Sequence, residues 1–348
     1  MEIETPSREH LPIITEKKSC LTLEVLDNEP GFYQYVIKPM LYPGHEGELC
    51  TWLKEMGLMQ RSLRCHNALK SPTCNVPMKW TQARIVDKYQ WKCGECCRKR
   101  PIRDDSFFKN TKCSLTATLR IILGWCKDMA PEEIIDILNV KIHVVKRLYQ
   151  ACSQIAEGYV RTHRNDWKLG GPDVIVIIDL YPDGCAKVSG ANPEYQNNNP
   201  TQILCIAEAK TVPTNYWFHV MLSTDVDAAR EEALRVVRNM VKPGSVLVAD
   251  PNAKVCSYSE LLACKEYPTI VSIQDLMRHN KPESTILQNL ETIWDPAVRI
   301  CEEAQYYSHQ EVQSYLYNMM WRRRYSRTPS SALESLLHHI ADHYPSGY

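Results

Sequence analysis

Apolar and polar residues follow two different patterns along this chain. At residues 46–59 and again at 114–164 the apolar positions recur at helical spacing, whereas from residue 174 onward short runs of β-branched residues alternate with helical stretches. The second pattern predicts strands at Val174–Asp179, Ile203–Ala209, Tyr216–Leu222, Ser245–Asp250 and Thr269–Ile273. It predicts helices at Asp227–Val241, at Tyr258–Lys265 and around Glu291. The chain therefore divides near Gly170-Gly171-Pro172 into a helical part and an α/β part.

The α/β part runs as three strands, helix, strand, helix, strand, helix, which is the element order of a ribonuclease H-like domain. We therefore predict the fold class α/β, with a mixed sheet flanked by helices. In this order Asp179 and Asp250 lie at the ends of neighbouring strands, and Glu291 on the last helix faces them. Three such acids could hold two Mg²⁺ or Mn²⁺ ions for phosphodiester chemistry. Taken singly, each has an ordinary alternative: a turn residue for Asp179, an Asp-Pro turn for Asp250 and a solvated helix position for Glu291.

A cysteine cluster precedes the helical part. Cys93-Gly94-Glu95-Cys96 has the spacing of a zinc knuckle, and the cluster also contains Cys65, Cys74 and Cys97. Two pairs of thiolates brought together by a hairpin would bind Zn²⁺ and replace the core that so small a segment cannot build. Spacing leaves open whether Cys96 or Cys97 is the fourth ligand, and free cysteines in a basic loop are the alternative. We predict a small zinc-ribbon-like module.

Basic residues follow the cysteines and recur in the helical part. Residues 61–103 carry eleven Lys or Arg against Asp87 and Glu95. The helices Leu115–Lys127, Ala130–Asn139 and Lys141–Tyr159 resemble a helix-turn-helix unit. We predict DNA contacts by Arg98, Lys99, Arg100, Arg103, Lys141, Lys146 and Arg147. A solvated charged face and a three-helix packing unit without a DNA role are the alternatives.

Composition adds three constraints. The net charge is zero, which argues against a uniformly basic nucleic-acid binder and makes the local patches decisive. The N-terminus lacks the pattern of a signal peptide, so the 15 cysteines are expected to be reduced thiols in an intracellular protein. No apolar run approaches the length of a membrane span, so no membrane association is expected.

Several segments together resemble the Merlin superfamily of DDE transposases. The resemblance covers roughly residues 45 to 326. It includes Tyr89-Gln90-Trp91-Lys92-Cys93, Cys97-Arg98-Lys99-Arg100-Pro101-Ile102-Arg103, Ile178-Asp179, Lys242-Pro243-Gly244-Ser245, Val248-Ala249-Asp250, Leu290-Glu291-Thr292-Ile293-Trp294 and Trp321-Arg322-Arg323-Arg324. It implies a metal-binding triad of Asp179, Asp250 and Glu291, a zinc module, and metal-dependent DNA cleavage and strand transfer at element ends. It also implies a homo-oligomer acting on DNA in the nucleus, without an organic cofactor, and adds Arg322, Arg323 and Arg324 to the expected DNA contacts.

The expected organisation follows from the patterns and the resemblance together. We predict an acidic, loosely ordered leader at 1–44, a short helix with the zinc-ribbon-like basic module at 45–110, and a helical DNA-binding-like domain at 111–168. A ribonuclease H-like DDE transposase-type domain at 172–328 and a helical C-terminal tail with exposed histidines at 329–348 complete the chain.

The sequence departs from the family pattern close to the predicted triad. The family usually continues after its first Asp with Glu and a basic, Gly-rich segment, but here Leu180-Tyr181-Pro182 follows, and residues 186–199 carry only Lys187 as a positive charge. An Asn-His-Ser-like element is replaced by Val271-Ser272-Ile273-Gln274. These departures suggest a host gene derived from a transposase. A catalytically inactive DNA-binding or chromatin-associated protein, or a protein-interaction scaffold, is therefore the alternative to an active enzyme.

Overall fold

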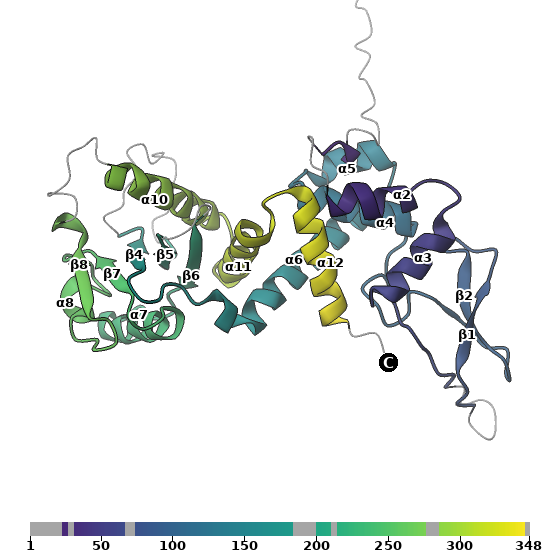
Figure 1. Ribbon diagram of the computed structural model, residues 1–348, viewed down its shortest axis with the longest axis horizontal. Helices are drawn as coiled ribbons and strands as arrows, with labels where there is room; N and C mark the ends of the chain where they lie inside the picture. The colour runs from purple at the N-terminus through teal and green to yellow at the C-terminus, as the bar shows by residue number, and fades with distance from the viewer. Residues whose placement is uncertain are drawn as a thin grey trace, which may run out of the picture.

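The protein is a mixed α/β chain with two β-sheets, seen in a computed structural model (Figure 1). The structure describes residues 23–26, 31–66, 74–183, 200–209, 214–275 and 285–344, with the backbone alone for 285–291. Residues 186–199, whose low charge distinguishes the sequence from the resembled family, lie outside these ranges, as do residues 1–22 of the predicted leader. None of the helices in the described ranges is apolar over a stretch long enough to cross a bilayer.

A small antiparallel sheet forms the first structural unit. Its strands are β1 (Met78–Gln82), β2 (Tyr89–Cys93) and β3 (Lys99–Pro101), in the order β1-β2-β3. Helix α3 (Glu46–Glu55) packs beside it with Leu49 and Leu53 buried. The Lys54 ammonium lies 4.9 Å from the centre of the Trp80 ring and 5.6 Å from that of Trp91, which fixes α3 against the sheet.

A helical unit follows, built from segments at both ends of the chain. It contains η1 (Tyr33–Ile37), α2 (Lys38–Met40), α4 (Leu115–Cys126), α5 (Pro131–Leu138), α6 (Ile142–Thr162) and α12 (Pro329–His343). The Ser114 hydroxyl caps α4 by accepting a bond from the Ala117 amide. Pro131 opens α5, and Asn139 ends it in a left-handed conformation (φ 52°), so the chain turns sharply into α6.

Both predicted tails of the chain are shorter than expected. Tyr33 and Ile37 in η1 are fully buried, so the leader predicted for 1–44 ends before residue 33. The predicted C-terminal tail is helical as expected, but it is the core helix α12, with Leu333 and Leu336 buried; His338 and His343 are exposed, whereas His339 is buried. Apolar residues at helical spacing in 329–343 carried this information, and burial of that face is the physical reason for both corrections.

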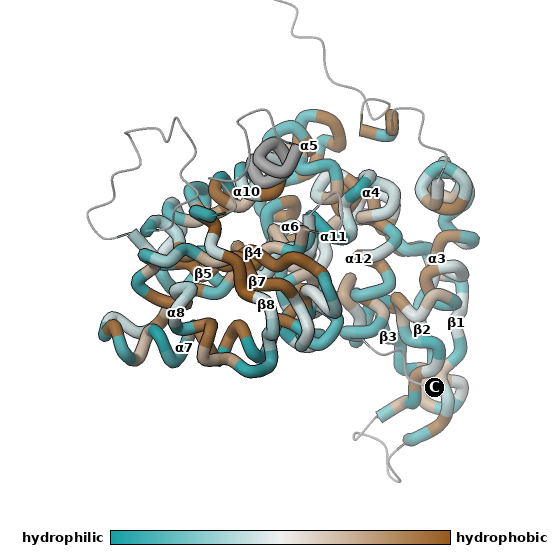
Figure 2. The backbone as a smooth tube through the Cα atoms, turned by 60° about the vertical axis from the view of Figure 1, so that its left-hand side comes forward, coloured by the Kyte–Doolittle hydropathy of each residue, from teal (hydrophilic) through white to brown (hydrophobic). Residues whose placement is uncertain are grey.

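The second sheet has five strands in the order β6-β5-β4-β7-β8. They are β4 (Ile175–Tyr181), β5 (Ile203–Glu208), β6 (Asn215–Val220), β7 (Val246–Ala249) and β8 (Thr269–Ser272). The pairs β4–β5 and β5–β6 are antiparallel, whereas β4–β7 and β7–β8 are parallel. Figure 2 shows the apolar character of β4, β5 and β7, in keeping with strands buried on both faces.

Helices and one short turn accompany this sheet and complete the predicted order of elements. They are η2 (Arg164–Trp167), α7 (Val226–Met240), α8 (Tyr258–Leu261), α10 (Thr285–Ala304) and α11 (His309–Tyr325). The succession of three strands, helix, strand, helix, strand and helix from β4 to α10 agrees with the sequence prediction. Boundaries differ by a few residues; β4, for example, extends to Tyr181 because it continues to pair with β5.

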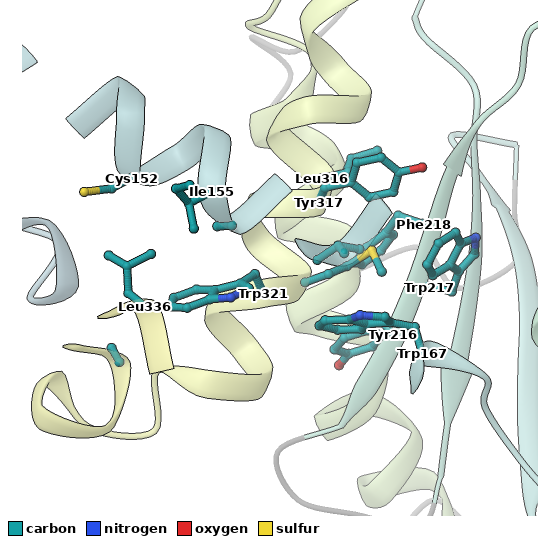
Figure 3. Close-up of a cluster of buried hydrophobic side chains, with 14 of the residues drawn as sticks. Cys152, Ile155, Trp167, Tyr216, Trp217, Phe218, Leu316, Tyr317, Trp321 and Leu336 are labelled. Carbon is teal, nitrogen blue, oxygen red and sulfur yellow. The ribbon is translucent and has the colours of Figure 1, made fainter. Parts of the chain in front are cut away.

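One continuous core joins the helical unit to the large sheet. Trp321 on α11 is fully buried and lies among Ile155 of α6, Leu336 of α12 and the aromatic residues of β6 (Figure 3). At the junction, Gly170 adopts φ 77°, and a Cβ there would lie 2.2 Å from the Ser245 hydroxyl oxygen. Glycine is therefore required where the helical part meets the sheet.

Candidate functional site

Four cysteines come together at one end of the small sheet. The Sγ atoms of Cys65 and Cys96 are 3.4 Å apart, those of Cys74 and Cys93 are 3.6 Å apart, and all four lie within 4.8 Å of one another. Tetrahedral Zn–S bonds of about 2.3 Å place sulfur atoms about 3.8 Å apart, close to these separations. This group could therefore hold a metal ion.

Two backbone pairings build the cluster. The Cys65 amide donates to the Val76 carbonyl at 2.9 Å and the Met78 amide donates to the Leu63 carbonyl at 2.8 Å, so the nine-residue spacing from Cys65 to Cys74 is spanned by antiparallel flanks. On the other side, the Cys96 amide donates to the Cys93 sulfur at 3.5 Å. Amide donation to a sulfur orients that sulfur and stabilises its thiolate form.

Cys97 lies outside the cluster. It is exposed and has a left-handed backbone (φ 56°), which turns the chain from the knuckle into β3. The question that spacing left open is answered by this geometry, with Cys96 as the fourth member. Burial raises the pKa of the Cys65 thiol to about 12, with hydrogen bonds from the neighbouring thiols adding to the effect. Metal binding would have to displace this proton.

Asp179 and Asp250 occupy matching positions on two adjacent parallel strands. Ile177 of β4 pairs with Val248 of β7; Asp179 lies two residues further along β4, and Asp250, two residues after Val248, is the first residue beyond β7. Side chains two residues apart in a strand share a face, and neighbouring strands are about 4.8 Å apart. Both carboxylates therefore belong to one face of the sheet, near the carboxyl ends of β4 and β7. Both residues are buried, at 7% and 8% exposure.

Local hydrogen bonds hold the two carboxylates. Asp179 Oδ1 accepts from the Leu180 amide at 2.9 Å, and Asp250 Oδ1 accepts from the Asn252 amide at 2.9 Å. Asp179 lies inside β4 rather than at its end, because β4 pairs with β5 beyond the last pair with β7. Of the two aspartates, only Asp250 therefore occupies the predicted position at the end of its strand.

Glu291 lies on α10, and its side chain is outside the described residues. Trp294, one helical turn later, lines a pocket together with Asp179, Tyr181 and Pro182. The Tyr216 hydroxyl also donates to the Ile293 carbonyl, which ties α10 to the large sheet. The α10 segment that follows Glu291 therefore packs over the sheet beside Asp179.

The basic residues of the small sheet divide into exposed and paired groups. Arg98 and Lys99 are exposed, although Arg98 donates to the His66 carbonyl at 2.6 Å. Arg100 pairs with Asp104 at 2.8 Å and with Asp105 at 3.2 Å. Arg103 is buried against Asp87 and also donates to the Thr111 carbonyl at 2.9 Å. Arg103 is thus a structural residue, and we remove it from the expected DNA contacts.

The basic residues of the helical unit lie at the exposed start of α6. Lys141 and Arg147 are exposed. Lys146 is also exposed and lies 3.5 Å from Glu132 of α5. Such a solvent-exposed pair is weak, so this end of α6 remains a cationic surface.

The three consecutive arginines of α11 are engaged within the protein. The guanidinium of Arg322 lies 4.0 Å from the Trp125 ring centre, that of Arg323 lies 5.0 Å from Tyr216, and that of Arg324 lies 4.7 Å from Trp167. Arg322 also donates to the Trp125 carbonyl, and Arg324 donates to the Asp166 carbonyl. These arginines fasten α11 to its neighbours, and we remove them from the expected DNA contacts.

Sequence reasoning missed two features near these sites. Lys254, in the loop after Asp250, pairs with Asp183 at 2.7 Å and so links the chain segments that follow the two aspartates. Lys112 lines a groove with the exposed face of α6. The three- and four-residue spacing of polar residues on α6 could have indicated that face. Nothing in the sequence near Lys254 or Asp183 indicates that the two residues pair.

Comparison with known proteins identifies no relative of this chain. No protein-family model matches the chain, and no curated protein sequence matches it.

Proposed function

We propose that this chain is a DNA-binding protein of the DDE transposase type, which cleaves the DNA backbone with a divalent metal held by Asp179, Asp250 and Glu291. The observation that carries the proposal is the matched register of Asp179 and Asp250 on adjacent parallel strands. Two buried carboxylates on one face of the sheet, near the ends of adjacent strands, would repel each other, and a bound cation removes that repulsion.

The sheet supports a ribonuclease H-like domain as the frame of this site. In chain order its strands lie as third, second, first, fourth, fifth, with the first three antiparallel and the last two parallel to the first. The resembled family places its acids on the first and fourth strands and on a later helix. Asp179, Asp250 and Glu291 occupy β4, the end of β7 and α10 in the same way.

Each group of residues at the site has a separate role. The donor atoms are carboxylate oxygens, which suit Mg²⁺ or Mn²⁺, and the amides of Leu180 and Asn252 keep those oxygens oriented. A bound metal pair would activate water or a DNA 3′ hydroxyl and stabilise the leaving oxygen. Tyr181, Pro182 and Trp294 line the pocket beside Asp179.

The cysteine cluster supports a structural Zn²⁺ site. Cys65, Cys74, Cys93 and Cys96 supply four soft sulfur donors with the spacing of a closed tetrahedral site, which leaves no open position for catalysis. The proposed zinc site stabilises the small sheet, which presents the exposed Arg98 and Lys99 to DNA. We extend the proposal to a homo-oligomer acting in the nucleus, since cleavage and joining of paired DNA ends needs two copies of the site.

A strand-cleavage assay tests the enzymatic proposal. Purified protein with Mg²⁺ should nick supercoiled plasmid, and chelation should abolish the product. Asp179→Asn and Asp250→Asn should each lower the rate at least about 100-fold, since each removes an anionic metal ligand. Asp173→Asn, an exposed change near the start of β4, should leave it unaltered. Equal nicking by wild type and Asp250→Asn would refute the catalytic assignment.

Binding of DNA without cleavage is the second candidate function. Leu180, Tyr181 and Pro182 stand where the resembled family has charged residues, and the Lys254–Asp183 pair occupies the adjoining edge. This candidate predicts DNA affinity that falls steeply with salt and no metal-dependent product. An affinity independent of salt between about 50 and 200 mM would contradict it.

A further inference from the structure

A polar, cationic groove separates α6 from the loop that follows the small sheet. Its volume is about 310 Å³, and Lys112, His143 and Arg147 line it. Among the described residues that line the groove none carries a carboxylate, and its two large apolar members, Phe107 and Leu148, are mostly buried. The groove is therefore suited to an anionic ligand that also offers hydrogen-bond donors and acceptors.

One stripe of α6 forms a wall of this groove. His143, Arg147, Gln150 and Gln154 are spaced by four, three and four residues, so they share one side of the helix over three turns. His143, Arg147, Gln150 and Gln154 are all exposed. The stripe is about 16 Å long at 1.5 Å per residue, which matches about five nucleotides of one DNA strand.

The opposite wall is held in place by the small sheet. Lys112 and Asn110 lie in the loop after Phe108, and the Arg103 guanidinium binds the Thr111 carbonyl while pairing with Asp87. The buried ion pair thus positions the loop that carries Lys112. The groove needs both the small sheet and the helical unit to be complete.

The groove face differs from the neighbouring basic face of α6. Lys146 is adjacent to Arg147 in sequence, but it does not line the groove and lies near Glu132 of α5. The two residues have the same charge and similar exposure. The groove therefore separates Lys146 from Arg147, and we remove Lys146 from the expected DNA contacts; the two residues form a matched pair for deciding which side of α6 meets DNA.

We infer that this groove is the DNA-reading surface of the chain, with Lys112 and Arg147 on backbone phosphates and Gln150 and Gln154 facing base edges. The inference rests on the proposed DNA binding and names where it occurs. Arginine and lysine neutralise phosphates, whereas the glutamine amide offers a donor and an acceptor that match the major-groove edge of adenine. Asn110 and His143 add donors on the two walls.

The test measures binding of the full-length protein to a fluorescently labelled 20-base-pair duplex of random sequence by anisotropy. Arg147→Gln and Lys112→Gln should each weaken binding about fivefold or more at 100 mM salt and lower the salt slope by about one. Lys146→Gln should change the affinity less than twofold. Circular dichroism should be the same for all three variants, because the substituted side chains are exposed.

The outcomes separate this inference from the proposed function. Wild-type binding with equal losses in Lys146→Gln and Arg147→Gln would overturn the groove while leaving DNA binding in place. Normal binding by the double variant Lys112→Gln/Arg147→Gln would do the same. Absence of wild-type binding to any duplex would overturn both. A loss confined to the two groove variants would support the assignment.

Discussion

The two candidate metal centres are built in opposite ways. The four cysteines lie within 32 residues of one another and are gathered by hairpins that pair along neighbouring chain segments. Asp179 and Asp250 are 71 residues apart and meet because β4 and β7 are neighbours in a sheet assembled from distant segments. The first centre lies in a small module whose own core is limited to a few side chains such as Leu53 and Trp91, whereas the second lies on a large sheet with an extensive core.

This difference predicts different responses to loss of a ligand. Removing a thiolate should dissolve the local fold, while removing a carboxylate should leave the fold and abolish the chemistry.

The largest effect should follow the loss of one cysteine ligand. Cys93→Ser should abolish stoichiometric Zn²⁺ binding and unfold the small sheet, since structural zinc contributes an apparent 10–16 kcal/mol, roughly, in small modules. Zinc content of the desalted protein by mass spectrometry, together with near-ultraviolet circular dichroism, to which Trp80 and Trp91 contribute among the eight tryptophans, would report this. Cys97→Ser is the matched control, because Cys97 lies next to Cys96 but outside the cluster. Full zinc content in Cys93→Ser, or its loss in Cys97→Ser, would contradict the ligand set.

Magnesium should act on the carboxylate centre alone. Ten millimolar Mg²⁺ should stabilise wild type by about 1–2 kcal/mol by mass action and should not stabilise Asp250→Asn. Thermal unfolding of the two proteins with and without Mg²⁺ provides the measurement, with Asp173→Asn as the control that keeps the response. An equal Mg²⁺-induced rise in the unfolding temperature of Asp250→Asn would show that Mg²⁺ does not bind at Asp179 and Asp250. After chelation, Mg²⁺ should restore this increment but not the fold of the cysteine module.

The contrast also explains what could be predicted from sequence. The order of elements from β4 to α10 was predictable, because each strand and helix has its own apolar period. The choice between Cys96 and Cys97 was not, since it depends on the left-handed backbone of Cys97. Local patterns report secondary structure, whereas the backbone conformation of a single turn residue decides the ligand.

Charge was the least reliable guide. The run Arg322-Arg323-Arg324 reads as a basic patch, yet each guanidinium lies over an aromatic ring from a distant segment. Arg103 likewise belongs to a buried pair with Asp87. Sequence gives the number of cations in a stretch but not their partners, because those partners are brought in by tertiary packing. Exposed and buried charge can be separated only once the core is known.

The core between the two centres should show a pH dependence. His339 is buried, stacks on Tyr159 with ring centres 3.6 Å apart and accepts a bond from the Trp321 indole at 3.0 Å. Burial lowers the pKa of His339 from 6.5 to about 4. The unfolded chain therefore binds more protons between these values, and stability falls as the pH drops from 6.5 to 4.

The expected loss is about 2 kcal/mol, after discounting for solvent screening. His339→Gln, which keeps an acceptor for Trp321, should flatten the dependence of the free energy of unfolding on pH over this range. His338→Gln, an exposed change on the same helix, should not. Urea unfolding at pH 7 and pH 4.5 measures both. An unchanged pH dependence in His339→Gln would place the titrating group elsewhere.

The smallest effect should come from the arginines that fasten α11 beside the large sheet. Arg322→Ala removes a guanidinium that stacks on Trp125 and donates to its carbonyl at 3.1 Å, so it should cost about 1–2 kcal/mol of unfolding free energy. Arg327→Ala, on the exposed turn after α11, should cost less than about 0.5 kcal/mol. Because Arg322 is used inside the protein, its removal should lower stability while leaving DNA affinity nearly unchanged, the reverse of Arg147→Gln. A loss of DNA affinity without a loss of stability in Arg322→Ala would return α11 to the DNA surface and remove the distinction between the two basic stretches.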